Sequence, residues 1–215
     1  MLYPLKLDKT RLKIFHEGRK RRIFAGEIQY DAKKDKYVLM YDEDYTHLKS
    51  AIALGPTLDL LHLRHYSEKG KMFPIFLDRI PDRLNPAYQD YCDSQNISVD
   101  EKNPMVLLGS IGRRGPSTFI FEAVYRSEFT STDITQFREH HDITQHDFAA
   151  VFDLSLATLQ RIESGASVDL NTLKRIEILL TFPDVALWQL KQTGAEVHKD
   201  VLIKLKKYFQ RSSQL

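Results

Sequence analysis

Two patterns of apolar residues divide the chain near Arg126. Before that residue, apolar and β-branched residues occur in short runs between polar breaks, which is typical of strands joined by turns. After it, apolar residues recur with the period of a helix and few strand formers follow one another. The first three runs predict a β-meander: residues 12–16, 22–30 and 36–41.

The rest of the first half predicts two more strands and several short helices. Residues 58–63 and 118–125 are the candidate strands. Residues 73–91, interrupted by Pro74, Pro81 and Pro86, and residues 104–110 predict short helices, with Pro86 and Pro104 in first-turn positions. We therefore expect an α+β domain, a β-meander with short helices, over residues 1–127, followed by an all-α helix-turn-helix domain over 128–192.

Residues 143–165 predict two helices joined by a tight turn. Thr144 and Ser155 are suitable N-caps, and Asp147 stands three residues after Thr144, in the capping-box position. Asp153 fits the turn because aspartate tolerates a left-handed backbone better than most residues other than glycine. With Leu159 and Ile162 facing inward, the outward face of the second helix holds Ala157, Thr158, Gln160 and Arg161.

This segment resembles the Xre/Cro family of helix-turn-helix repressors. The resemblance rests on Thr144-Gln145, Ala149, Leu154-Ser155, Leu159, Ile162-Glu163 and Gly165, with Phe137-Arg138-Glu139 matching the first helix and residues 173–180 the fourth. It implies that the second helix enters the major groove of operator DNA. The residues implied to bind DNA are Thr144, Gln145, Ser155, Ala157, Thr158, Gln160 and Arg161.

The chain departs from the family pattern at three positions. Asp153 stands where glycine is usual, and Leu156 and Ala157 stand where polar base-reading side chains are common. We therefore expect base recognition to depend on contacts with thymine methyl groups and on Gln160 and Arg161.

Charge complicates this interpretation. The whole chain has a net charge of +2, but residues 131–190 hold four Lys or Arg against nine Asp or Glu. DNA-binding domains are usually basic, because attraction to phosphate supplies most of their non-specific affinity. A helical bundle kept for dimerisation or protein contact therefore remains an alternative.

The end of the chain, residues 193–215, predicts a basic amphipathic helix. Its lysines and arginine offer one source of phosphate attraction: Lys204, Lys206, Lys207 and Arg211. Its apolar residues repeat at helical spacing and predict instead a helix packed on a neighbour or on a second subunit: Val197, Val201, Leu202, Leu205 and Phe209.

The first domain resembles the N-terminal subdomain of HipA-type toxin kinases. The residues that carry this resemblance are, in order, Gly26-Glu27-Ile28, residues 36–39, residues 72–82, residues 105–112 and Gly115. In the tripartite form of those systems the subdomain is a separate protein, HipS, beside a helix-turn-helix protein, HipB, and a shortened kinase, HipT. The usual acidic-glycine pair after the Leu-Pro element is Asp82-Arg83 here.

Together the two resemblances imply a HipS-like domain fused to a HipB-like domain. Such a chain would be an antitoxin that inhibits a HipT-like Ser/Thr kinase toxin and represses its own operon, as a homodimer on operator DNA. The runner-up is a stand-alone transcriptional regulator whose first domain senses a ligand or binds a protein. The third candidate function is that of a protein-only inhibitor with a degenerate helix-turn-helix.

Catalytic and metal chemistry is not expected. The chain lacks the glycine loop, strand lysine and Asp/Asn set of a kinase, so we expect no enzyme, no catalytic residue and no cofactor. Residues 109–115 are the nearest candidate for a phosphate cradle but lack the Gly-Lys-Ser/Thr ending, which favours a loop between a helix and a strand. Asp59, His62 and His65 are spaced by three, but a strand there would separate them, so no metal is expected.

Composition also bears on the compartment. The single cysteine, Cys92, cannot form an internal disulfide, and this fits a reducing cytoplasm. The first fifteen residues contain no continuous apolar segment for export, and no run approaches the roughly 20 apolar residues needed to span a membrane. We expect a cytoplasmic protein that does not contact the membrane.

Overall fold

The computed structural model of the chain describes residues 3, 5–166 and 169–213. They form two compact units, one over Leu7–Arg126 and one that joins the described part of Met1–Lys6 to Ser127–Leu215. The first is an α+β unit and the second is all-α, which confirms the predicted fold class. The chain therefore passes between the units twice, once after Lys6 and once after Arg126.

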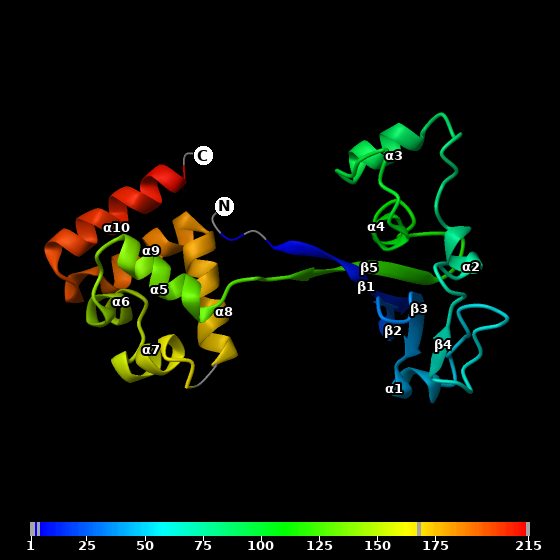
Figure 1. The fold of residues 1–215 in the computed structure, drawn as a ribbon, viewed down its shortest axis with the longest axis horizontal. Helices are drawn as coiled ribbons and strands as arrows, with labels where there is room; N and C mark the ends of the chain where they lie inside the picture. Colours follow the sequence, from blue (N-terminus) through cyan, green and yellow to red (C-terminus); the bar gives the residue numbers. More distant parts are fainter. Residues whose placement is uncertain (1–2, 4, 167–168, 214–215) are drawn as a thin grey trace. The chain divides into compact units, whose positions relative to one another are not determined.

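A five-stranded sheet in the order β4-β3-β2-β1-β5 forms the centre of the α+β unit (Figure 1). Strands β1 to β4 pair in antiparallel fashion along the chain, so the predicted meander is confirmed. Gly26 lies opposite Tyr41 with φ of 150°, and an added Cβ would stand 2.2 Å from the Met40 carbonyl oxygen, so only glycine fits. The strands are β1 (Lys6–Glu17), β2 (Arg22–Asp31), β3 (Lys36–Tyr41), β4 (Arg64–Tyr66) and β5 (Phe119–Arg126).

Short helices pack on this sheet. Met105 and Leu108 of α4 enter the same apolar core as the strand residues Leu12, Ile28 and Phe121. Helix α4 begins at Pro104, as predicted, because the Asn103 side chain accepts the Met105 N–H at 2.8 Å. The helices of this unit are α1 (Glu43–Thr46), α2 (Pro74–Leu77), α3 (Tyr88–Ser94) and α4 (Pro104–Gly109).

Two details of the first unit differ from prediction. Residues 58–63 form a loop, because the Asp59 carboxylate accepts the backbone N–H groups of Leu61 and His62 at 2.8 and 3.1 Å and so replaces the hydrogen bonds of a strand. The strand begins only at Arg64. Pro86 lies outside the first turn of α3, whose N-cap is Ala87.

The all-α unit packs its helices around one apolar core. Phe148, Phe152 and Leu159 lie at its centre. The predicted C-terminal helix, α10, packs on the same core through Val201, Leu205 and Phe209. The helices are α5 (Ser131–His140), α6 (Gln145–Val151), α7 (Leu156–Glu163), α8 (Leu170–Thr181), α9 (Pro183–Thr193), the 3₁₀ turn η1 (Gly194–Glu196) and α10 (Lys199–Ser212).

Residues 3, 5 and 6 group with the helical unit, whereas the predicted first domain began at residue 1. The Tyr3 ring meets Phe129 edge-on, with ring centroids 4.8 Å apart, and Tyr3 packs against the core of the all-α unit. The Thr181 hydroxyl donates to the Tyr3 carbonyl at 3.4 Å. Tyr3 thus belongs to the helical unit, although 123 residues separate it from the start of that unit's main segment at Ser127.

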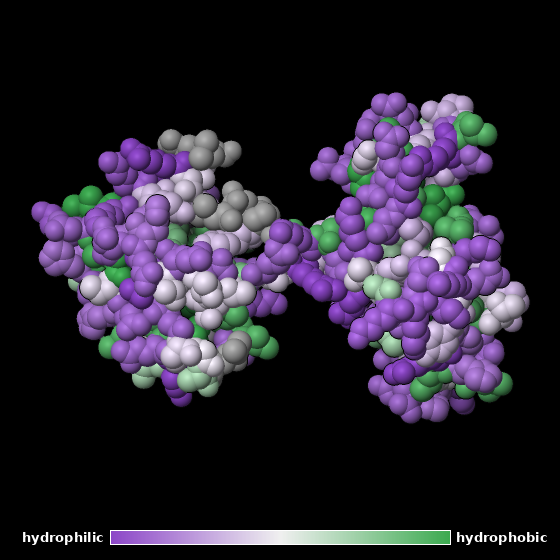
Figure 2. Space-filling model, in the orientation of Figure 1, coloured by the Kyte–Doolittle hydropathy of each residue, from purple (hydrophilic) through white to green (hydrophobic). Residues whose placement is uncertain are grey.

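Figure 2 shows one face of each unit as mainly polar, with apolar patches on it. Among the described residues, the structure contains no helix that is long and apolar enough to cross a membrane.

We expect Tyr3→Ala to destabilise the helical unit by about 1–2 kcal/mol, because it removes a partly buried aromatic pair. Urea unfolding followed by the fluorescence of Trp188, the single tryptophan, reports on this unit directly. Leu5→Ala is the control, because Leu5 is 59% exposed, and its effect should stay within about 0.5 kcal/mol. Equal effects of the two changes would contradict the docking of Tyr3.

Candidate nucleic-acid interface

Two side-chain caps set the starts of α6 and α7. Thr144 accepts the Asp147 N–H at 3.0 Å, and its hydroxyl donates to the Asp147 carboxylate at 2.7 Å. Ser155 accepts the Thr158 N–H at 3.0 Å. Both caps were predicted from the sequence and are confirmed, because capping depends on residues only three positions apart.

The turn between α6 and α7 is held by a left-handed residue and an arginine. Asp153 has φ of 52°, which L residues rarely adopt. Arg175 from α8 donates to the Asp153 carboxylate at 3.1 Å and to the Phe152 carbonyl at 3.0 Å. The departure from glycine at this position is thus accompanied by an ion pair that fastens the turn to α8.

A buried carboxylate joins three helices behind the turn. The Glu163 side chain, 7% exposed, accepts from the Arg138 guanidinium at 2.9 and 3.2 Å and from the Gln145 amide at 2.6 Å. Arg138 also donates to the Ile143 carbonyl at 3.2 Å. These contacts connect α5, α6 and α7. The motif matched Arg138 and Glu163 to the family pattern but did not indicate that they pair.

The residues predicted to contact DNA lie on α7 and at the start of α6. Gln145 and Gln160 are brought together, with the Gln160 amide donating to the Gln145 side-chain oxygen at 3.5 Å. Thr158 and Gln145 are half-buried; the Thr158 hydroxyl lies 2.8 Å from the Ser155 hydroxyl, and the Gln145 amide donates to Glu163. The exposed members are Thr144, Ser155, Ala157, Gln160 and Arg161.

The outward face of α7 carries no exposed carboxylate among its described residues. Glu163 is the only acidic residue of α7, and it is turned inward onto Arg138. Arg161 is exposed, with its Nε donating to the Ala157 carbonyl at 3.4 Å. This face is therefore polar to weakly basic, although the surrounding segment has a net negative charge.

Most acids of this segment have local structural roles. The Asp169 carboxylate caps α8 by accepting from the Thr172 hydroxyl at 2.6 Å and from the Asn171 N–H at 3.0 Å. These hydrogen bonds, the Thr172 hydroxyl foremost, lower the pKa of Asp169. Other acids with a partner in the described structure are Asp133 with Thr130, Asp147 with Thr144, Asp142 with Lys204 and Asp153 with Arg175.

The basic residues of α10 lie away from α7. Figure 1 places α10 at the opposite end of the helical unit. The apolar face of α10 packs on the core of its own unit. There, Phe209 stacks on Phe137 with the ring centroids 6.2 Å apart. Of the two interpretations of this segment, packing on a neighbouring element is the one observed.

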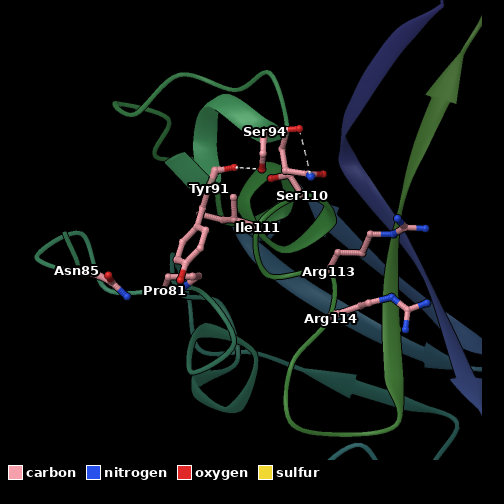
Figure 3. Close-up of a pocket in the computed structure, with 9 residues that line it drawn as sticks. Pro81, Asn85, Tyr91, Ser94, Ser110, Ile111, Arg113 and Arg114 are labelled. Atoms are coloured by element: carbon pink, nitrogen blue, oxygen red, sulfur yellow. Dashed lines mark hydrogen bonds between the residues drawn. The ribbon is translucent and has the colours of Figure 1, made fainter. Parts of the chain in front are cut away.

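A second candidate site is a cavity of about 430 Å³ in the α+β unit (Figure 3). Tyr91, Ser94 and Ser110 line it, and Arg113 and Arg114 border it. The guanidinium groups of these two arginines point toward the strands, away from Tyr91. Arg113 bonds Glu122 at 3.1 Å and Arg114 bonds Glu17 at 2.9 Å, so their charges are already paired. The cavity is therefore not an arginine-lined phosphate cradle.

Residues 110–115 form a loop between α4 and β5, as predicted, while Gly109 is the last residue of α4. Arg79 holds this loop by donating to the Gly112 carbonyl at 3.3 Å and to the Phe119 carbonyl at 2.7 Å. Burial lowers the pKa of Arg79. An added Cβ at Gly115 would stand 3.0 Å from the Arg79 guanidinium carbon, so glycine makes room for this contact.

His62 and His65 each bond Asp59. His62 Nδ1 lies 3.0 Å from the Asp59 carboxylate, whereas His65 Nε2 bonds the Asp59 carbonyl at 2.9 Å. Across residues 3, 5–166 and 169–213 the structure contains no group of three His, Cys, Asp or Glu residues placed to hold a metal ion.

Comparison with protein-family models identifies two domains. A helix-turn-helix model matches residues 134–182, and a model of the HipA N-terminal domain matches residues 19–119. Both resemblances drawn from the sequence are confirmed, in the predicted order. Searches of curated proteins and of solved structures find no match.

We expect Asp153→Val to destabilise the helical unit by about 1–2 kcal/mol, because a β-branched residue is strained at this φ. Asp153→Gly should stay within about 1 kcal/mol of the parent, since relief of strain opposes removal of the Arg175 ion pair and the greater freedom of the unfolded chain. Urea unfolding measures both. Asp200→Val, at an exposed helical aspartate, is the control, and an equal destabilisation there would contradict the role of the left-handed turn.

Proposed function

We propose that this chain, which joins a HipA N-terminal domain to an Xre/Cro-type helix-turn-helix domain, is an antitoxin and autorepressor. The two domains fit a DNA-binding regulator or antitoxin. In the proposal, the first unit binds and inhibits a HipT-like Ser/Thr kinase toxin. The second unit binds operator DNA in the promoter of the operon that encodes both proteins.

The observation that carries the DNA-binding part is the outward face of α7. Leu159 and Ile162 hold the helix on the core, and the opposite face is exposed without a carboxylate in its described residues. A second helix presented in this way lies in the major groove in helix-turn-helix complexes. The side chains near its start are then the ones that reach base edges.

The proposed contacts follow from side-chain chemistry. Gln160 can bond adenine in a bidentate manner, Arg161 can bond guanine or phosphate, and Ala157 can contact a thymine methyl group. Thr144 and Gln145 at the start of α6, with Ser155 and Thr158 at the start of α7, suit contacts with the DNA backbone. The Gln145 amide is already held by Glu163, so it is positioned before DNA arrives.

The kinase-binding part rests on the family match and on exposed apolar side chains of the first unit. Leu84, 90% exposed, lies in the loop that follows Pro81 and Asp82. Leu77 and Tyr91 on either side of this loop are also exposed. Exposed apolar side chains that follow one another closely in the chain suit a protein partner. A kinase held there would change operator occupancy if the two binding events are coupled, because such linkage is reciprocal.

One observation favours the alternative, a stand-alone transcriptional regulator with a ligand-sensing first domain. The cavity lined by Tyr91, Ser94 and Ser110 has a volume of about 430 Å³, within the range of small-molecule sites. Its arginines are paired with Glu122 and Glu17, so a ligand there would be recognised by hydroxyl and amide groups rather than by free positive charge. A protein-only inhibitor is the third candidate if the helical unit binds no DNA.

We expect Gln160→Ala and Arg161→Ala each to weaken operator binding by about 1–3 kcal/mol, because each change removes a side chain that bonds a base edge. Fluorescence anisotropy with duplex DNA from the chain's own promoter region measures this. Gln210→Ala and Lys206→Ala remove matched exposed side chains from α10 and should leave binding unchanged. If the α7 variants bind as the controls do, α7 is not the DNA-reading helix. If the parent shows no binding even at low salt, the protein-only inhibitor replaces the repressor.

We expect the chain to co-purify with the kinase encoded beside its gene and to suppress that kinase's activity. Leu84→Asp should reduce both effects, because it places a charge in an apolar contact. Ile203→Glu is the matched control, because Ile203 is an exposed apolar residue of the helical unit. A kinase that neither co-purifies nor is inhibited, beside a chain that still binds its promoter, would leave the stand-alone regulator as the better description.

A further inference from the structure

The connection between β1 and β2 carries a run of four basic residues that the proposed function does not use. Arg22, the last of the four, begins β2 and is paired with Glu122. Arg19, Lys20 and Arg21 form the basic turn between the strands, and all three are exposed. In the part of the chain that the structure describes, no ion pair involves any of these three residues. The basic turn therefore presents three adjacent positive charges to solvent.

The basic turn is short, and backbone hydrogen bonds fix it on both sides. The Gly18 N–H donates to the Arg21 carbonyl at 2.9 Å and so closes the turn between the two strands. The Glu17 N–H donates to the Thr118 carbonyl at 2.8 Å, which joins the end of β1 to the segment before β5. The backbone that carries the three charges is therefore already ordered, and a partner that binds there does not have to order it.

Two carboxylates lie beside the basic turn, and both are already paired with other arginines. Glu17, the last residue of β1, accepts from Arg114 at 2.9 Å. Glu122 of β5 accepts from the Arg113 Nε at 3.1 Å and also pairs with Arg22. Each carboxylate is thus matched by at least one arginine outside the basic turn. Neither one offsets the charge of the three exposed cations.

We propose that the basic turn binds the phosphate backbone of duplex DNA and does so without reading the base sequence. Arginine and lysine bond phosphate oxygens, and such contacts carry no information about the bases. Long side chains on consecutive residues of a turn point in different directions. They therefore suit a row of phosphates along a strand better than a single small anion.

The distribution of charge along the chain favours DNA as the polyanion, a choice that rests on the proposed function. Attraction to phosphate supplies essentially all non-specific affinity for DNA. Residues 131–190 hold four Lys or Arg against nine Asp or Glu, and the basic residues of α10 lie away from α7. Residues 11–22, by contrast, hold six Lys or Arg against one Asp or Glu. The basic turn therefore supplies the attraction to phosphate that the helix-turn-helix segment lacks.

Two variants of the full chain that lose the same charge test this proposal. The test variant replaces the three cations of the basic turn: Arg19→Gln, Lys20→Gln and Arg21→Gln. The control variant replaces three exposed lysines scattered over other turns and loops of the same unit: Lys33→Gln, Lys69→Gln and Lys102→Gln. Arg22 stays in place in both because it holds Glu122, and circular dichroism verifies that both variants fold.

Fluorescence anisotropy with a duplex of unrelated sequence, between about 50 and 200 mM salt, measures both the affinity and its salt dependence. The test variant should bind at least about tenfold more weakly than the parent at the lower salt concentration. The slope of log affinity against log salt should become shallower by about one for each cation that contacts phosphate. Duplex DNA from the chain's own promoter region should lose affinity by the same factor, because its phosphates are the same. The control variant should stay close to the parent in both measurements.

The same measurements distinguish failure of this proposal from failure of the repressor function. If the test and control variants bind DNA equally while the parent prefers promoter DNA, the basic turn is not a DNA contact and the repressor function stands. If the parent binds all duplexes alike and the test variant loses that binding, the contact stands and the repressor function fails. A test variant that keeps its affinity for DNA but no longer retains the neighbouring kinase would overturn the proposal in favour of an acidic protein surface. A parent that binds no duplex at about 50 mM salt would overturn it as well.

Discussion

The helix-turn-helix depends on one buried carboxylate. Glu163 is almost fully removed from solvent, and an ionised group there is stable only if its oxygens are bonded. Arg138 from α5 and Gln145 from α6 supply those bonds. The need to satisfy one charge therefore ties α5, α6 and α7 together, while Leu159 and Ile162 on the core turn the opposite face of α7 outward.

What the sequence predicted well was local. The caps at Thr144 and Ser155, the helical start at Pro104 and the β-meander all depend on residues close together in the chain or on the period of apolar positions. The prediction of a strand at residues 58–63 was wrong, and the reason is local too. The Asp59 side chain competes for the backbone N–H groups that a strand would have used.

What the sequence did not reveal was long-range. Tyr3 packs against Phe129, and no periodicity connects residues so far apart. The sequence likewise did not indicate the hydrogen-bond partners of Glu163, although Arg138 and Gln145 belong to the matched motif. The net negative charge of residues 131–190 leaves out another long-range feature, the place of each carboxylate in the fold. A sum of charges does not say which carboxylates cap helices or pair with arginines, whereas the folded structure does.

Because the chain crosses between the two units twice, the HipA-type domain is an insertion in the helical unit. Its first and last strands, β1 and β5, are neighbours in the sheet, and Asp8 near the start is paired with Arg126 at the end. The chain thus enters and leaves this domain at one point, and the domain takes the place of a loop between Tyr3 and Phe129. Domains whose two ends lie close together tolerate insertion and exchange, so replacing this domain leaves the helical unit intact as long as Tyr3 keeps its contact with Phe129.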